Sequence, residues 1–443
     1  LTENLLLDDQ YIREHTTGFD AVARAVSDTT WSDIERFSGC SQVDIAEFAQ
    51  MYAEAKSAVF VWSMGITQHR YGVDNVKSIV NVALARGMIG KEKCGLMPIR
   101  GHSGVQGGAE MGCVPWNFPG GNAVNDESAE RMADEWSFAV PGQPGLTAVE
   151  MIDAGARGLL DILYSVGGNF LETLPEPDRV RRSLETIPFR VHQDIVLSSQ
   201  MLVDPAETVV ILPAATRYEQ PGGGTETSTE RRVYYSPEIP GRRIGESMPE
   251  WQILLKVAEA AYPNEASCLA LETAQDIRNE ISRVIPMYHG IEKLRVQGDA
   301  FQWGGPRLCE NGEYGTPDGK GKFSVVTPPE MMLDEDHFIL STRRGKQFNS
   351  MVHREKDPLT GAQRDAVFIS RADADRLNVQ QGSKVLLQSS GGTFVGYCHI
   401  AEIKERNLQV YWPESNVLIE SGRTDPQCGI PDYNALVTLE PIT

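Results

Sequence analysis

A glycine-rich stretch, residues 100–112, holds the residue types best suited to bind a small anion. It has five glycines among thirteen residues, together with Arg100 and His102. Because glycine has no Cβ, backbone N–H groups in such a loop can approach a ligand closely. The arginine adds a permanent charge whose forked N–H groups match a carboxylate. Taken alone, a glycine-rich run is more often a surface loop than a binding site.

Two further segments place a glycine turn directly after a predicted strand. The strand predicted at residues 58–62 runs into Ser63-Met-Gly65, and the strand predicted at residues 158–166 runs into Gly167-Gly-Asn169. Open α/β sheets bind nucleotides at such strand ends, where backbone N–H groups meet phosphates. Together with the glycine-rich stretch, these turns predict a site for a phosphate-bearing ligand.

Four motifs follow one another in a fixed order: Ser63-Met-Gly-Ile-Thr-Gln-His69, Ala85-Arg-Gly-Met-Ile-Gly90, Pro98-Ile-Arg-Gly-His-Ser-Gly-Val-Gln-Gly107 and Glu110-Met-Gly112. In this order they resemble the formate dehydrogenase alpha subunit, one of the bis-molybdopterin-guanine-dinucleotide oxidoreductases. The resemblance extends over residues 1–443. The His-Ser-Gly form of the loop, followed by Phe118-Pro-Gly-Gly121, is closer to a poorly characterised formate-dehydrogenase-like subgroup.

The resemblance implies a bis-molybdopterin guanine dinucleotide cofactor that carries molybdenum or tungsten. The chain starts at Leu1, within a predicted helix, and its first methionine is Met51. We therefore expect an upstream part that holds the protein ligand of the metal and the cysteines of an iron–sulfur cluster. No metal ligand is predicted in the present chain.

Cofactor contacts of the family map onto positions in both halves of the chain. They are Gly65, Gln68, Gly101, Gly168, Asn169, Gln193, Asp194, Thr342, Arg343, Gly345, Gln347, Asn349, His353 and Asn416. For Gln193 and Asp194, the local sequence equally suits a capped helix N-terminus, and only the resemblance favours a ligand role.

Two residues are the predicted catalytic groups. Arg100 is the best candidate in this chain to hold an anionic substrate, because a guanidinium can bind both oxygens of a carboxylate. His102 stands where formate dehydrogenases usually carry a glutamine, so we expect it to tune proton transfer. The predicted reaction is the two-electron oxidation of formate to carbon dioxide, or redox chemistry on a related small anion. An electron-transfer protein is the expected partner.

Two other functions remain open from the sequence. The first is another molybdopterin reductase, acting on nitrate, thiosulfate or polysulfide. The second is an electron-transfer scaffold of the same fold without the cofactor. A scaffold would not need the motifs at Gly65, Arg100, Asn169 and Arg343, and their presence favours an enzyme.

Composition excludes some partners and indicates a compartment. The net charge of −20 argues against nucleic acid and against an anionic membrane surface. No apolar run is long enough to span a membrane. The seven cysteines include no Cys-x-x-Cys pair, which favours reduced thiols and a cytoplasmic location over zinc or disulfide sites.

The order of predicted elements indicates an α/β fold: parallel-sheet, Rossmann-like cofactor-binding domains followed by a C-terminal double-psi β-barrel. Alternating strands and helices predict parallel sheets covered on both faces. The expected domains are a partial α/β cofactor-binding domain at 1–100 and a second, also partial, at 101–215. An irregular connecting region at 216–330, with one clear helix at Glu250–Ala261, precedes the dinucleotide-binding barrel at 331–443.

Overall fold

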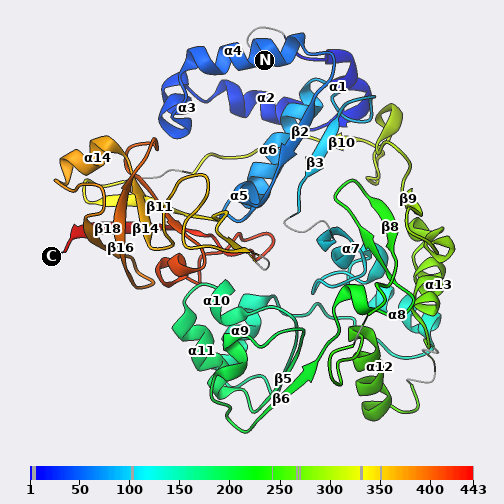
Figure 1. The fold of residues 1–443 in the computed structure, drawn as a ribbon. Helices are drawn as coiled ribbons and strands as arrows, with labels where there is room; N and C mark the ends of the chain where they lie inside the picture. Colours follow the sequence, from blue (N-terminus) through cyan, green and yellow to red (C-terminus); the bar gives the residue numbers. More distant parts are fainter. Residues whose placement is uncertain are drawn as a thin grey trace.

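The computed structural model describes residues 1, 6–100, 104–241, 243–265, 268, 271–329, 333–349 and 352–442, without the side chains of 348, 349, 352 and 353. Four bodies can be followed in Figure 1: a helical layer at the N-terminus, the C-terminal barrel, and two mixed layers formed by the middle of the chain. Strands β2 and β3 run from the helical layer toward the centre of the view.

The N-terminal layer packs helices against one face of a short parallel sheet. Strand β2 (Val59–Trp62) pairs with β3 (Gly95–Pro98). Ser41 caps α4 by accepting a hydrogen bond from the Asp44 amide, as its sequence predicts. The helices are α1 (Asp9–His15), α2 (Phe19–Ser27), α3 (Trp31–Ser38), α4 (Gln42–Glu54), α5 (Met64–Thr67) and α6 (Gly72–Ala85).

A later segment returns to this layer and completes its core. Strand β1 (Thr16–Thr17) pairs in parallel with β10 (Gly321–Lys322). The pairing brings Phe323 against Leu84 of α6 in one hydrophobic cluster. Residues far apart in the sequence therefore share a core.

The second layer is a parallel sheet of β4 (Ile162–Val166), β5 (Phe189–Asp194) and β6 (Thr208–Pro213), in that order. Val180 and Leu184 of α11 pack with Leu163 of β4 beneath it. The helices of this part are α9 (Ala148–Ala156), α10 (Phe170–Thr173) and α11 (Pro177–Thr186), whereas α7 (Val105–Glu110) and α8 (Asp126–Trp136) lie beside the part of the chain that holds α13 (Ala274–Val284) (Figure 1).

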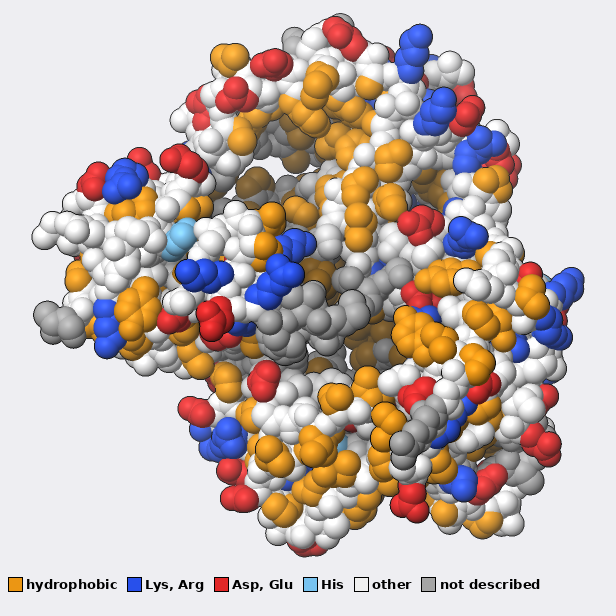
Figure 2. All heavy atoms as spheres, viewed as in Figure 1, with side chains coloured by type: hydrophobic (Ala, Val, Ile, Leu, Met, Phe, Trp, Pro, Cys, Tyr) orange, Lys and Arg blue, Asp and Glu red, His pale blue; other side chains and the backbone are white. Residues whose placement is uncertain are grey.

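Both parallel sheets leave one face largely open, so the expectation of cover on both faces is wrong for the described residues. In β2, Val59 and Val61 are 50% and 55% exposed, and in β4, Ile162 and Val166 are 60% and 50% exposed. These residues alternate along their strands with residues that pack into a core. Figure 2 shows hydrophobic side chains gathered over β2 and β3.

Residues 216–330 contain more regular structure than the sequence indicated. The predicted helix is α12 (Glu250–Ala261), and a second helix, α13 (Ala274–Val284), follows it. Thr273 and Asp276 form a capping box at its start. An antiparallel sheet joins β7 (Gly224–Thr227), β8 (Arg232–Ser236) and β9 (Ala300–Gln302).

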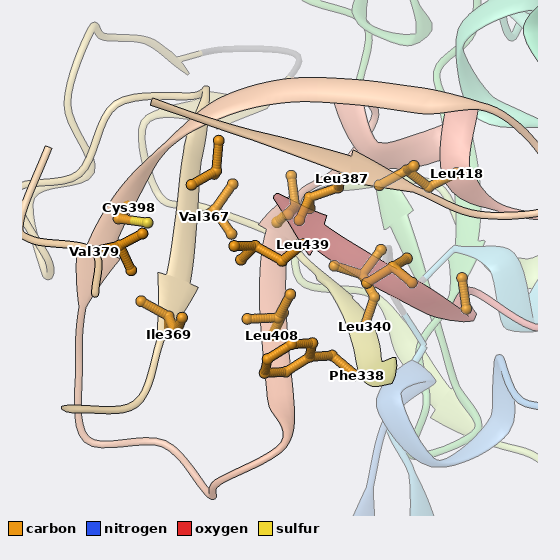
Figure 3. Packing of buried hydrophobic residues seen from close by; sticks show 14 of the residues in the cluster. Phe338, Leu340, Val367, Ile369, Val379, Leu387, Cys398, Leu408, Leu418 and Leu439 are labelled. Carbon is orange, nitrogen blue, oxygen red and sulfur yellow. The ribbon is translucent and has the colours of Figure 1, made fainter. Parts of the chain in front are cut away.

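The C-terminal part confirms the predicted barrel. Six strands close in the order β11-β17-β14-β16-β15-β18. Leu340, Val367, Leu387 and Leu408 point into its core and are fully buried (Figure 3). The elements are β11 (His337–Arg343), the hairpin of β12 (Phe348–Asn349) and β13 (Val352–His353), β14 (Ala366–Ile369), α14 (Arg371–Arg376), β15 (Lys384–Gln388), β16 (Thr393–Ile400), β17 (Asn407–Tyr411) and β18 (Asn434–Pro441). No helix among the described residues is long and apolar enough to cross a membrane.

Candidate active site

Tyr433, just before β18, connects three of the predicted binding segments. Its amide donates to the carbonyl of Gln68 (3.4 Å), and its carbonyl accepts from the amide of Thr342 (3.2 Å). Its hydroxyl donates to the carbonyl of Thr173 (2.9 Å), at the end of the short helix that Asn169 begins. Burial raises the pKa of this phenol, so it remains a donor. The segments around Gln68, Asn169 and Thr342 therefore meet at one place.

Asn416 makes a second link between the barrel and α10. Its Nδ2 donates to the carbonyl of Glu172 (2.6 Å), and its own carbonyl accepts from the amide of Glu176 (3.2 Å). The side chain is fully buried, yet Oδ1 has no hydrogen-bond partner among the described residues. A buried acceptor without a donor is costly, and a ligand that donates there would remove the cost.

The turn after β4 leaves open space beside its backbone. Gly167 and Gly168 have φ angles of +69° and +79°, and nothing lies within 4 Å of a Cβ built on either. Gln200, fully buried, braces the turn: its Oε1 accepts from the amide of Phe170 (2.7 Å) and its Nε2 donates to the carbonyl of Gly168 (2.9 Å). Asn169 Nδ2 donates to Ser199 Oγ (2.9 Å), whereas its buried Oδ1 is unpaired among the described residues.

Gln200 belongs to this site although it was not among the residues predicted from the sequence. Its amide reaches the turn from η2 (Ser199–Leu202), which lies about thirty positions farther along the chain. No motif marks it, because its role depends on how β5 and η2 pack rather than on local spacing.

Gln193 is fully buried at the carboxyl end of β5 and is engaged by the protein on both sides. Its Oε1 accepts from the Tyr164 hydroxyl (2.7 Å), and its Nε2 donates to the carbonyl of Glu250 (3.2 Å). Asp194 accepts from the amide of Ile195 (2.7 Å). Burial raises the pKa of Glu250, and the charge of Asp194 raises it further. The geometry gives Gln193 a role in fixing the sheet; its ligand role remains a prediction.

The loop after β11 contains a buried side-chain amide without a partner. Gln347 is fully buried, and neither its nitrogen nor its oxygen has a hydrogen-bond partner among the described residues. A Cβ on Gly345 would lie 1.8 Å from Gln347 Oε1 and 2.7 Å from the Tyr411 ring, so any other residue there would force its neighbours to shift. Arg343 turns toward the barrel wall: it donates to Gln409 Oε1 (3.0 Å) and stacks 4.3 Å from the centre of the Phe368 ring.

Arg100 lines a cavity of about 520 Å³ at the carboxyl ends of β2 and β3. Its amide donates to Thr229 Oγ1 (3.3 Å), and its Nη1 approaches the carbonyl of Pro98 (3.5 Å). Ser63 Oγ donates to the carbonyl of Ile99 (3.1 Å), which holds the two strand ends together. Gly65 lies in the short helix α5 rather than in the predicted turn, and nothing lies within 4 Å of a Cβ built on it.

Four of the predicted site residues lie, in whole or in their side chains, outside the residues that the structure describes. Gly101 and His102 lie outside the described residues, as do the side chains of Asn349 and His353. Within the described ranges, no three His, Cys, Asp or Glu side chains lie together in a way that could hold a metal ion.

The unpaired polar atoms fit a large ligand rich in donors and acceptors. The side-chain oxygens Oδ1 of Asn169 and Asn416 are buried and have no hydrogen-bond partner among the described residues. The same holds for both the oxygen and the nitrogen of the Gln347 side-chain amide. Pterin and guanine edges carry the complementary N–H and C=O groups. The open glycine turn after β4 leaves room for a phosphate near backbone N–H groups.

Family comparison agrees with this site. Residues 42–260 match the molybdopterin oxidoreductase family, and residues 338–437 match the molybdopterin dinucleotide binding domain. The chain belongs to the molybdopterin oxidoreductases. The matched domains support molybdopterin guanine dinucleotide with molybdenum as its cofactor, and the amides of Asn169, Gln347 and Asn416 are suited to hold it.

Relatives of this chain include formate dehydrogenases and the protein YdeP. Protein YdeP of Escherichia coli (strain K12) is 31% identical over 98% of this chain and 59% of its own length. The F420-dependent formate dehydrogenase subunit alpha of Methanocaldococcus jannaschii is 31% identical over 98% of this chain and 65% of its own length. Formate dehydrogenase H of Escherichia coli (strain K12) is 27% identical over 100% of this chain and 64% of its own length. The chain thus spans about three-fifths of the length of these relatives.

One solved structure shares the fold over the whole chain. Acetylene hydratase from Pelobacter acetylenicus superposes with a TM-score of 0.68, at 13% sequence identity, over 100% of this chain and 68% of that one. At this identity the similarity concerns the fold.

Proposed function

We propose that this chain is the cofactor-binding and substrate-binding part of a molybdopterin oxidoreductase that oxidises formate, or a related small anion, by two electrons. Support comes from the family match, from formate dehydrogenases among the relatives, and from one observation above all. Arg100 lines a cavity at the carboxyl ends of two parallel strands, the place where α/β sheets bind ligands.

Arg100 binds the carboxylate of the substrate in this proposal. Within the described part of the chain no carboxylate forms an ion pair with it, so its charge is available to a ligand. The hydrogen bond from its amide to Thr229 fixes the backbone from which the guanidinium extends. A forked donor that holds both oxygens also orients the C–H bond of formate in one direction.

The cofactor supplies the two-electron redox chemistry when it is bound, and this chain supplies binding, orientation and charge. Asn169, Gln347 and Asn416 hold the cofactor through their buried amides. Tyr433 keeps the barrel and α10 in place around it. His102, the second residue after Arg100 in the sequence, tunes proton transfer in this proposal, so His102→Gln is expected mainly to move the pH–rate profile.

Substitution of Arg100 in the cofactor-loaded enzyme tests the proposal. Arg100→Ala is expected to lower kcat/KM for the native substrate by about 30- to 1,000-fold, because a forked, partly dehydrated contact is lost. Arg100→Lys should recover only part of the loss, since a point charge cannot bind two oxygens at once. Arg371→Ala, at an exposed position of α14 on the far side of the barrel, is the control and should leave kcat/KM unchanged.

Cofactor content is measured in every variant before rates are compared. Turnover by fully loaded Arg100→Ala at the parent rate would refute the role of Arg100. Assays with formate, nitrate, thiosulfate and polysulfide identify the substrate, and turnover of formate alone supports the proposed reaction. Reduction of nitrate, thiosulfate or polysulfide without formate oxidation would replace it by a reductase.

A further inference from the structure

The motif Glu110-Met-Gly112 lies at the end of α7 and has no part in the reaction described above. Met111 packs in the same hydrophobic cluster as Tyr288. Gly112 has a φ angle of +83°, and a Cβ built on it would lie 3.0 Å from the ring of Pro119. These two contacts fix where α7 ends and how the chain leaves it.

The carboxylate of Glu110 binds segments that lie far along the chain. Its Oε1 accepts from Nε2 of Gln106 (2.5 Å), one turn earlier in α7. Its Oε2 accepts from the hydroxyl of Tyr288, in η5 (Pro286–Tyr288), and from Nε1 of Trp303 (3.2 Å), directly after β9. One carboxylate with three donors therefore ties the end of α7 to segments 178 and 193 positions away.

Tyr288 extends this connection to β7. Its side chain is almost fully buried, and burial raises its pKa, with the neighbouring Glu110 raising it further. The phenol therefore keeps its proton and donates it to Glu110, so it accepts from the hydroxyl of Thr227 (2.7 Å), the last residue of β7. These three side chains form one line of hydrogen bonds between β7 and α7.

Helix α7 also lies directly against β7. A Cβ built on Gly104, the residue before the helix, would lie 3.2 Å from Cγ of Glu226. A Cβ built on Gly107 would lie 3.1 Å from Oγ1 of Thr227. Positions three apart share one face of a helix, and glycine at both of them lets α7 come this close to the strand.

The hairpin of β7 and β8 also contacts the chain just before residues 101–103. The amide of Arg100 donates to Oγ1 of Thr229 (3.3 Å), which lies between the two strands. The same hairpin therefore contacts Arg100 on one side of these three positions in the sequence and Gly107 on the other. A shared anchor limits how far Arg100 and α7 can move relative to each other.

We propose that Glu110 is a positioning residue: it holds α7 against the β7–β8 hairpin, and that hairpin holds Arg100 where it binds the substrate. This inference rests on the proposed function for the role of Arg100, and it adds Glu110 and the hairpin as the elements that place it. Position matters for a forked donor, because a displacement of about 1 Å can cost roughly 100-fold in rate.

Hydrogen exchange in the cofactor-loaded enzyme tests the first step without turnover. Glu110→Gln keeps the size of the side chain but turns an N–H group toward one of its donors, and Tyr288→Phe removes one donor. Peptides that contain residues 105–112 should exchange about fivefold faster, or more, in Glu110→Gln, since α7 is less firmly held. The same peptides should exchange faster in Tyr288→Phe as well, but to a smaller degree.

Two exposed residues provide matched controls. Glu130→Gln on α8 and Tyr262→Phe at the end of α12 should exchange as the parent does. Thermal unfolding shows whether each variant is folded, and cofactor content is measured in all of them. Unchanged exchange of α7 in both Glu110→Gln and Tyr288→Phe would overturn the proposal.

Steady-state kinetics separates positioning from general destabilisation. A displaced Arg100 binds the substrate less well, so Glu110→Gln should raise KM about tenfold, whereas loss of folded enzyme would lower kcat and leave KM unchanged. Glu110→Asp keeps the carboxylate on a shorter side chain and should recover part of the parent KM. A parent-like KM in Glu110→Gln would contradict the proposal.

A double-mutant cycle shows whether Glu110 acts through Arg100. In the Arg100→Ala background, Glu110→Gln should lower kcat/KM by less than about twofold, because residues that act together are not additive. The same factor with and without Arg100 would overturn the proposal. If Arg100→Ala alone kept the parent rate, the proposed function and the step through Arg100 would fail, whereas faster exchange in Glu110→Gln would still show that Glu110 fixes α7.

Discussion

Leu340, Leu387 and Leu408 of the barrel are fully buried, whereas Val61 of β2 and Ile162 of β4 are more than half exposed. The difference follows from topology. A closed barrel places every second side chain in one shared interior, whereas an open sheet has two faces that other elements must cover. Among the described residues, the largest cluster of buried hydrophobic side chains lies in the barrel, and the predicted binding segments after β2 and β4 lie on the more open parallel sheets.

Replacement of a barrel leucine should have the largest effect on stability. Leu408→Ala removes a fully buried side chain and leaves a cavity, so the free energy of unfolding should fall by about 2–5 kcal/mol. Val61→Ala, on the open face of β2, should change it by no more than about 0.5 kcal/mol. Urea unfolding followed by circular dichroism measures both. Equal losses of unfolding free energy in the two variants would contradict the difference in burial between the barrel and β2.

Two glycines give the next comparison. In Gly345→Ala, the new Cβ would lie 1.8 Å from Gln347 Oε1 and 2.7 Å from the Tyr411 ring, so we expect a loss of about 1–3 kcal/mol. Gly65→Ala has open space and a helical position, and should leave stability unchanged or raise it by up to about 1 kcal/mol. Thermal unfolding of both variants tests this, and a stable Gly345→Ala would contradict the packing described.

Contact between the two regions can be weakened by removing one oxygen. Tyr433→Phe loses the hydrogen bond to the carbonyl of Thr173 and should cost about 1 kcal/mol. Tyr397→Phe, at an exposed position of the barrel, is the matched control and should be neutral. Hydrogen exchange of the α10 amides gives a local readout. Unchanged exchange in Tyr433→Phe would mean that other contacts fix α10 against the barrel.

Low pH should weaken the contact between Asp425, in the segment before β18, and the amide of Val73 in α6. We expect this to be the smallest of the four effects on stability. Burial by itself raises the pKa of Asp425, but hydrogen bonds from the amides of Val73, Gln427 and Cys428 outweigh it, so the pKa lies below its usual value. The ionised group therefore adds stability above the unfolded pKa of about 4, and this contribution is lost as the pH falls through the lower folded pKa. Asp425→Asn should lose stability less steeply below pH 5 than the parent, by under about 1 kcal/mol. Asp375→Asn, on the surface of α14, is the control and should show the same dependence of unfolding free energy on pH as the parent. The same pH dependence in the parent and in both variants would refute this prediction.

The barrel was predictable because its strands carry local signals. Alternating apolar residues such as Leu340 and Leu408, and the cap at Ser370, mark elements without knowledge of the rest of the fold. The pairing of β9 with β8 was missed because the two strands lie about seventy positions apart in the sequence. This pairing depends on contacts that no local pattern encodes.

The candidate site was predictable only where a motif marks it. Resemblance identified Asn169, Gln347 and Asn416, and the structure gives each of them an unpaired buried polar atom. Gln200 could not be found in this way. Its role depends on which residue of η2 points toward the turn after β4, and that is fixed by packing.

Closure of the barrel also affects how the protein meets other copies of itself. Each barrel strand has a hydrogen-bonded neighbour on both sides, so no strand there offers backbone groups to a foreign chain. In the part of the chain that the structure describes, β2, β3, β4 and β6 each keep one edge without a strand partner. Strands β7 and β9 of the antiparallel sheet do so as well, so self-association of a damaged or partly unfolded molecule would begin at the open sheets rather than at the barrel, with the −20 net charge opposing it.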